Sequence, residues 1–246
     1  MALKITSTSP RFMAKAGEGL ERVPYEDWSK DLERVSLMYN KIEELPFRPP
    51  ICPQLTTLLL RYNRLLGIPN SFFVHMHHLN VLDLSGTYIE SLPNSISKLV
   101  NLHTLLLKDC VRLKYVPSLE KLKALKELKL KRSQIEVPQG IEELVNLRNL
   151  DLSWNNSLQT FPCWKLSRLS QLQCLRIDAT RAKVSAKELL CLRQSKVLRA
   201  HLLNVQEQTS YATSQRCQSL ENYRLVVGND LEYPISTIGN EKHNVL

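Results

Sequence analysis

Leucines recur along most of this chain in one pattern, L-x-x-L-x-L, which opens at regular intervals. The stretch x-L-x-L-x alternates apolar and polar residues with a period of two, which predicts a short strand with one buried face. The successive openings lie 23, 24, 23, 23, 22 and 25 residues apart, at Leu32, Leu55, Leu79, Leu102, Leu125, Leu147 and Leu172. A spacing of roughly 20–29 residues predicts that each unit forms one turn of a coil and stacks on its neighbours.

Two polar features support the same unit. Each strand is followed by a short side chain with a hydrogen-bond donor, which predicts a turn that needs new partners for its backbone carbonyls: Asn40, Asn63, Thr87, Cys110, Ser133, Asn155 and Thr180. A proline follows in six units, where an extended backbone without ladder pairing accepts it. The predicted fold class is therefore α/β, a leucine-rich-repeat solenoid. Its curved parallel sheet forms the concave side, and short helices, 3-10 turns and loops form the convex side.

The pattern divides the chain into three segments. Residues 1–31 are a junction, in which Met1–Ser7 is expected to be a helix end and Trp28, with Leu20 and Val23, to cover the first repeat. Residues 32–181 are about seven regular repeats. Residues 182–246 are expected to be longer, degenerate repeats and a tail, with helices over 185–194 and 211–223, strands over 196–205 and 224–228, and no recognisable cap in 231–246.

Composition narrows the class of protein. The chain has 246 residues, of which 43% are hydrophobic and 23% are charged, so it is expected to be globular rather than disordered or membrane-spanning. Its first twenty residues lack the apolar stretch of a signal peptide. The six cysteines are then expected to be thiols of a cytoplasmic protein rather than a disulfide framework.

The motifs of catalysis are missing from the sequence. It contains no G-x-S-x-G elbow, no protein-kinase signature and no phosphate-binding G-x-x-x-x-G-K-[ST] loop. His75, His77 and His78 lack the i, i+4 spacing of a helical zinc pair, and no C-x-x-C occurs. We therefore predict no catalytic residue, no cofactor, no metal and no enzymatic activity.

The outward strand positions are the candidate site of a protein-binding surface, since tyrosine, tryptophan and arginine dominate interface energetics. The concave-face candidates are Arg61, Tyr62, Asp83, Lys108, Lys129, Lys131, Arg132, Trp154, Arg176 and Asp178. Lys108, Lys129, Lys131 and Arg132 form a basic patch within a chain of net charge +9. Two interpretations of this patch stay open: it is a docking site for an acidic protein, or it is an ordinary solvated surface. Nucleic-acid binding is disfavoured because aromatic residues are not interleaved with the basic ones.

Four pieces of sequence resemble plant intracellular disease-resistance proteins of the coiled-coil, nucleotide-binding, leucine-rich-repeat type. They are FMAKAGEGL with the following RVSLMYNKIEELP, CPQLTTLLLRYN with FFVHMHHLNVLDLSGTYIESLPNSI, the cysteine-containing repeat at 102–117, and SLENYRLVVG. The family's nucleotide-binding module has no counterpart here, so the resemblance covers its repeat region alone.

The resemblance implies a module of plant innate immunity that recognises a pathogen effector or a guarded host protein, or that restrains a nucleotide-binding switch. Two alternatives remain. A general intracellular repeat scaffold that binds small GTPases shares the L-P-x-x-I-x-x-L spacing but not FMAKAGEGL or SLENYRLVVG. A substrate receptor of a ubiquitin ligase needs a helical segment before the repeats, for which thirty-one residues are too few.

Overall fold

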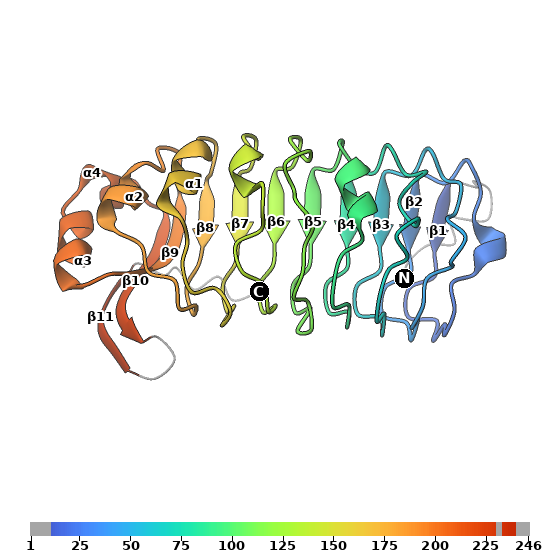
Figure 1. Ribbon diagram of the computed structural model, residues 1–246, viewed down its shortest axis with the longest axis horizontal. Coiled ribbons are helices and arrows are strands. Elements are labelled where there is room, and N and C mark those ends of the chain that lie inside the picture. The colour runs from blue at the N-terminus through green and yellow to red at the C-terminus, as the bar shows by residue number, and fades with distance from the viewer. Residues whose placement is uncertain (1–10, 230–232, 240–246) are drawn as a thin grey trace.

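The computed structural model describes residues 11–229 and 233–239 and folds them around one sheet. Eleven strands lie side by side in the order of the sequence (Figure 1). The first ten are parallel, and the last pairs antiparallel with the tenth. The strands are β1 (Phe12–Ala14), β2 (Arg34–Ser36), β3 (Thr57–Leu59), β4 (Val81–Asp83), β5 (Thr104–Leu106), β6 (Glu127–Lys129), β7 (Asn149–Asp151), β8 (Cys174–Arg176), β9 (Val197–Leu202), β10 (Asn222–Asn229) and β11 (Tyr233–Gly239).

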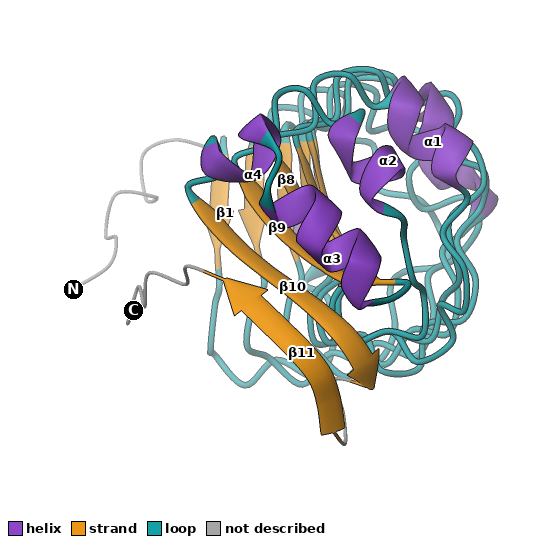
Figure 2. Ribbon diagram, turned by 90° about the vertical axis from the view of Figure 1, so that its left-hand side faces the viewer, coloured by secondary structure: helices purple, strands orange, loops and turns teal. Residues whose placement is uncertain are grey.

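Most of the short helices, among them α1 and α2, lie on the side of the coil away from the sheet (Figure 2). Three are 3-10 helices: η1 (Tyr25–Asp27), η2 (Asn94–Lys98) and η3 (Ile141–Glu143). Four are α-helices: α1 (Cys163–Arg168), α2 (Ala186–Leu190), α3 (Val205–Ala212) and α4 (Gln215–Gln218). This arrangement confirms the predicted α/β leucine-rich-repeat solenoid. None of the helices in the described ranges combines the length and apolar character that a membrane crossing requires.

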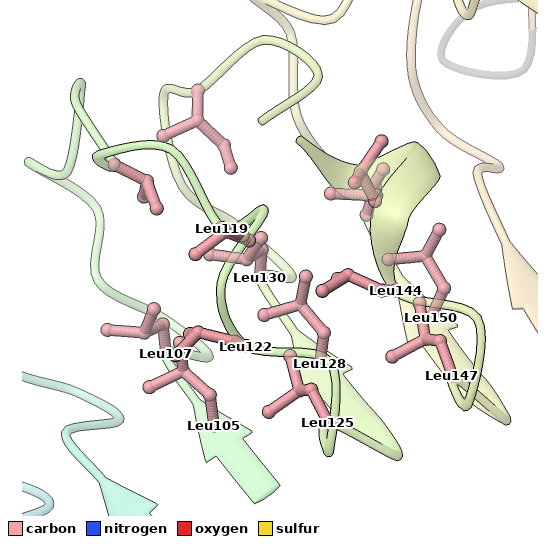
Figure 3. Close-up of a cluster of buried hydrophobic side chains, with 14 of the residues drawn as sticks. Leu105, Leu107, Leu119, Leu122, Leu125, Leu128, Leu130, Leu144, Leu147 and Leu150 are labelled. Atoms are coloured by element: carbon pink, nitrogen blue, oxygen red, sulfur yellow. The ribbon is translucent and has the colours of Figure 1, made fainter. Parts of the chain in front are cut away.

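The leucines of the repeat form one continuous core between the sheet and the convex segments. In the fifth repeat, Leu125, Leu128 and Leu130 are all fully buried. Figure 3 shows these three side chains among the equivalent leucines of the neighbouring repeats. Burying a large apolar side chain stabilises a fold by roughly 1.5–3 kcal/mol, and here the burial depends on the neighbouring turn of the coil.

The N-terminal segment contains a strand that the sequence pattern did not predict. β1 pairs in parallel with β2 and extends the sheet beyond the first regular repeat. Leu20, Val23 and Trp28 are half-buried against the core, as expected. The Trp28 ring meets the Phe72 ring edge-on, with centroids 6.4 Å apart. The helix end expected at Met1–Ser7 lies outside the described residues.

The C-terminal units differ in part from expectation. Leu175, Leu198 and Tyr223 are register partners, so the last two units are 23 and 25 residues long and are no longer than the regular ones. β9, β10 and α2 lie where strands and a helix were predicted. The single helix expected over 211–223 is wrong, because α3 begins at Val205 and α4 ends at Gln218. Within the tail, β11 forms a hairpin with β10; residues 230–232 and 240–246 lie outside the described ranges.

Candidate protein-binding surface

We call the outward face of the sheet the open face. A row of side chains that donate hydrogen bonds inside the coil holds this face in place. This donor row consists of Asn40, Asn63, Thr87, Cys110, Ser133, Asn155 and Thr180, all of them buried. Asn63 Nδ2 donates to the carbonyls of Leu37 (2.7 Å) and Leu60 (2.9 Å), and its Oδ1 accepts from the Ile42 N–H. One asparagine therefore links two turns of the coil.

Asn40 and Asn155 make similar sets of bonds, whereas the shorter side chains of the donor row make fewer. Thr87 Oγ1 donates to Leu84 O of its own repeat at 2.7 Å. The Cys110 thiol donates to the same carbonyl at 3.2 Å, which confirms its predicted role as a buried hydrogen-bonding residue. Burial raises the pKa of the Cys110 thiol, so this side chain stays a neutral donor.

The residue before each donor lies in the left-handed region of backbone conformation. This left-handed row has φ between +50° and +69° and consists of Tyr39, Tyr62, Gly86, Asp109, Arg132, Trp154 and Ala179. The N–H of Tyr62 donates to Ser85 O at 2.7 Å, and the N–H of Asp109 donates to Lys131 O at 2.8 Å, so the next repeat holds the conformation in place. The left-handed residue turns the backbone, so the donor that follows it points inward. The side chain of the left-handed residue itself lies on the rim of the open face.

Two tyrosines of the left-handed row form a rigid stack. The rings of Tyr39 and Tyr62 lie 4.9 Å apart between centroids at an angle of 17°. The ring of Tyr62 also lies across Gly86, where an added Cβ would come within 2.4 Å of Cδ1. The guanidinium of Arg61 lies 5.1 Å from the centroid of the Tyr39 ring. Both tyrosines are about half exposed, so the stack is a fixed part of the surface.

The predicted basic patch contains both paired and unpaired cations. Lys129 Nζ lies 2.5 Å from Glu127 Oε1, and Arg132 Nη1 lies 3.6 Å from Asp109 Oδ1. Within residues 11–229 and 233–239, no carboxylate lies within 4.0 Å of the ammonium group of Lys108 or Lys131. These two lysines occupy the same position in adjacent repeats, two residues beyond the paired Leu106 and Lys129. They are therefore the cations of this patch that remain available to a partner.

Two of the predicted surface residues are buried instead. Asp83 is 5% exposed because it lies in register between Leu59 and Leu106, whose longer side chains flank it. Its Oδ1 accepts a hydrogen bond from the Ser85 N–H at 3.0 Å. Asp178 is 4% exposed. The expectation that both carboxylates present themselves to a partner is wrong, because neighbouring side chains cover them.

Asp178 lies among arginines near the end of the regular repeats. Arg224 Nη1 is 4.0 Å from Asp178 Oδ2, and Arg176 Nη1 is 3.9 Å from Asp151 Oδ2 in the preceding repeat. Burial raises the pKa of Asp178 above its ordinary value, although the charges of Arg199 and Arg224 act in the opposite direction. Loss of hydration therefore outweighs ion pairing at this carboxylate.

The structure brings six of the ten candidates together on one half of the open face: Arg61, Tyr62, Lys108, Lys131, Arg132 and Trp154. Lys129 is tied to Glu127, and Arg176 lies one repeat beyond Trp154. Tyr39 and Asp109 were missed by the sequence reasoning. Both precede a donor-row residue, as Tyr62 does, so an alignment of the repeats contains the signal that finds them.

The remaining chemistry among the described residues is sparse. They contain no group of three or more histidine, cysteine, aspartate or glutamate side chains placed to hold a metal ion. His78 Nδ1 lies 2.8 Å from Pro53 O, and His77 is exposed. Burial raises the pKa of Cys52 to about 11, which keeps that thiol protonated at neutral pH.

Comparisons with known proteins agree with this geometry. The family described as "Leucine-rich repeat region" matches residues 52–220. Disease resistance protein At4g27190 of Arabidopsis thaliana is 34% identical over 235 residues, covering 88% of this chain and 24% of the relative. Putative disease resistance protein At4g10780 of the same plant is 40% identical over 174 residues, covering 68% of this chain and 19% of the relative.

A solved structure matches the fold. The leucine-rich-repeat protein LIC12759 of Leptospira interrogans superposes with a TM-score of 0.65 at 25% identity, over 81% of this chain and 55% of that one. The chain spans about a quarter or less of the length of the two curated relatives described above. The chain belongs to the leucine-rich repeat region family, in the form found in plant disease-resistance proteins.

Proposed function

We propose that the chain is a non-enzymatic, cytoplasmic protein-interaction module of the plant defence response. It recognises a pathogen effector or a guarded host protein, or it restrains the nucleotide-binding switch of a disease-resistance protein. Its relatives bear the name of disease-resistance proteins, and leucine-rich-repeat domains are protein-interaction scaffolds. No nucleic acid, metal or cofactor takes part in the proposed function.

One observation carries the proposal. Lys108 and Lys131 stand side by side on the open face, with no carboxylate within ion-pairing distance among the described residues. Two neighbouring like charges repel each other, and an acidic partner relieves that repulsion. Coupling to a switch follows if the nucleotide-binding module and the recognised protein compete for the same open face, since each then lowers the affinity of the other.

The test compares matched charge reversals in the full chain. Proteins captured from leaf extract by the parent are purified and titrated against two triple variants. The first is K129E/K131E/R132E on the open face, and the second is K114E/K121E/K123E away from it. We expect the first variant to weaken binding by about tenfold or more and the second by less than about twofold. A partner that binds all three chains equally contradicts the assignment of the open face.

A further inference from the structure

We infer that a band of side chains across the open face binds an extended acidic segment of the partner, about seven residues long and apolar at both ends. This inference rests on the proposed function, since it names the chemistry that the open face recognises. The band, called the aromatic–cationic band below, consists of Tyr39, Arg61, Tyr62, Lys108, Lys131 and Trp154.

The strand register sets the length of the band. Arg61, Lys108 and Lys131 each lie two residues beyond the last residue of a strand, in β3, β5 and β6. The aromatic ends belong to β2 and β7, which are five strands apart in the sheet. Neighbouring strands lie about 4.8 Å apart, so the band is about 24 Å long. An extended chain rises about 3.3 Å per residue, so about seven residues span it.

The centre of the band is cationic without internal compensation. In the described ranges, no carboxylate lies within 4.0 Å of the charged groups of Arg61, Lys108 or Lys131. Arg61 Nε is buried and has no hydrogen-bond partner, and the guanidinium rests on the Tyr39 ring. Ser85 lies between Arg61 and Lys108 and adds no charge, since its Oγ accepts from the Lys108 N–H. Carboxylates spaced along an extended segment supply what these three cations lack.

The ends of the band are aromatic, and their geometry favours a peptide over a nucleic acid. Tyr39 covers one face of Tyr62 and Gly86 covers the other, so the Tyr62 ring offers its edge and hydroxyl rather than a face for base stacking. Trp154, half exposed, closes the opposite end. Aromatic side chains around a cluster of charges exclude water and strengthen the ion pairs that form there.

The backbone supports a binding role for the aromatic ends. Tyr39, Tyr62 and Trp154 have a left-handed backbone conformation. Gly86 in the same row shows that glycine fits this position. A bulky residue in this conformation is less stable than glycine by roughly 1–3 kcal/mol, and such strain gathers at functional sites. Folding imposes the left-handed backbone on the whole row but does not require aromatic side chains there, since Gly86, Asp109 and Ala179 occupy the same position.

The experiment selects octapeptides from a random displayed library on the immobilised full chain and measures binding of the selected peptides by fluorescence anisotropy. We expect acidic residues at the central positions and apolar residues at the ends, with affinity falling as salt rises. K108E/K131E should weaken binding by about tenfold or more, and Trp154→Ala or Tyr39→Ala by about three- to tenfold. The matched control K121E/K123E, exposed lysines outside the band, should bind within about twofold of the parent.

Three results overturn the inference. They are selected peptides without an excess of acidic residues, equal binding by the parent and K108E/K131E, and tighter binding of a single-stranded oligonucleotide than of any selected peptide. Melting curves of each variant establish that it is folded before binding is compared. A chain that still binds a captured protein while selecting no acidic peptide overturns the band alone and leaves the proposed function standing.

Discussion

The regular repeats and the last two strands differ at one position, and the difference shows what sets the length of a strand. In the regular repeats, a left-handed residue and a buried donor end each strand after three residues. Twenty-three residues after Thr180, the equivalent position is Leu203, which has no donor and is 50% exposed. β9 accordingly runs for six residues, and β10 beside it for eight. The donor row therefore both links the turns and ends the strands.

A second difference follows on the convex side. In the regular repeats, this side is mostly turns and 3-10 helices, whereas α2 and α3 begin at capped residues. Ser185 and Glu188 form a capping box, and Asn204 Oδ1 accepts from the Glu207 N–H at 2.9 Å. These helix caps satisfy backbone groups within one unit, whereas the asparagines and Cys110 of the donor row also satisfy groups of the neighbouring turn. We therefore expect damage to spread in the regular repeats and to stay local at the C-terminal end.

The largest expected effect is a charge in the shared core. Leu150→Asp places an unpaired carboxylate where Leu150 is fully buried between β6 and β8, and we expect several repeats on both sides to unfold. Leu105→Asp should do the same, whereas Leu220→Asp near the end should unfold only the last units. Hydrogen exchange resolved by peptide is the measurement. Equal loss of protection in all three variants would contradict the contrast between the two regions.

The second-largest loss of stability is expected from substitutions in the donor row. Asn63→Ala leaves two buried carbonyls and one buried N–H without the partners that Asn63 supplied, so we expect a loss of about 2–3 kcal/mol in the free energy of unfolding. Thr87→Ala removes its 2.7 Å bond to Leu84 O and should cost about 1 kcal/mol. Urea denaturation compares the two. Similar losses would show that linking two turns adds nothing to stability.

A smaller loss is expected at the aromatic stack. Gly86→Ala adds a Cβ 2.4 Å from Tyr62 Cδ1 at a residue whose φ is +69°. The ring must move and the backbone is strained, so we expect a loss of about 1–2 kcal/mol. Gly67→Ala serves as the control, since nothing lies within 4 Å of its added Cβ and its φ is not left-handed. If the Gly86 variant melted at the same temperature as the control, the Tyr62 ring would not pack against Gly86.

A pH-dependent effect is expected where the regular repeats meet the last strands. Burial raises the pKa of Asp178 above its ordinary value of 3.8, so the folded chain binds this proton more tightly than the unfolded chain. Its contribution to stability is fully present below pH 3.8 and is lost as the pH rises through the raised pKa. Asp178→Asn should therefore gain stability relative to the parent between acidic and neutral pH. A stability difference that does not change with pH would indicate that Asp178 titrates normally.

The smallest effect on stability is expected from the surface lysines. Lys108 and Lys131 make no ion pair among the described residues, so K108E/K131E should change the free energy of unfolding by no more than about 0.5 kcal/mol. The measurement is the midpoint of urea unfolding beside that of K121E/K123E. A loss above about 1 kcal/mol would mean that these lysines stabilise the repeats, and the fall in binding could no longer be assigned to the band.

The candidate surface was predictable only in part. The repeat pattern places Lys108 and Lys131 outward, because alternation along a strand sends neighbouring side chains to opposite faces. The same rule sends Asp83 outward, yet Leu59 and Leu106 cover it, since a short side chain between two longer ones lies in a trough. The rule says nothing of Tyr39, which lies beyond the alternating stretch.

The spacing of leucines was enough to determine the architecture, because each unit can bury its apolar face only against the next turn of the same coil. The types of the donor-row residues were enough to locate the turns, since buried carbonyls need donors. Tertiary structure alone decided the left-handed conformation of residues such as Tyr62 and Trp154, whose types favour strands. Hydrogen bonds from their N–H groups to the next repeat outweigh that preference, and those bonds exist only once the coil has formed.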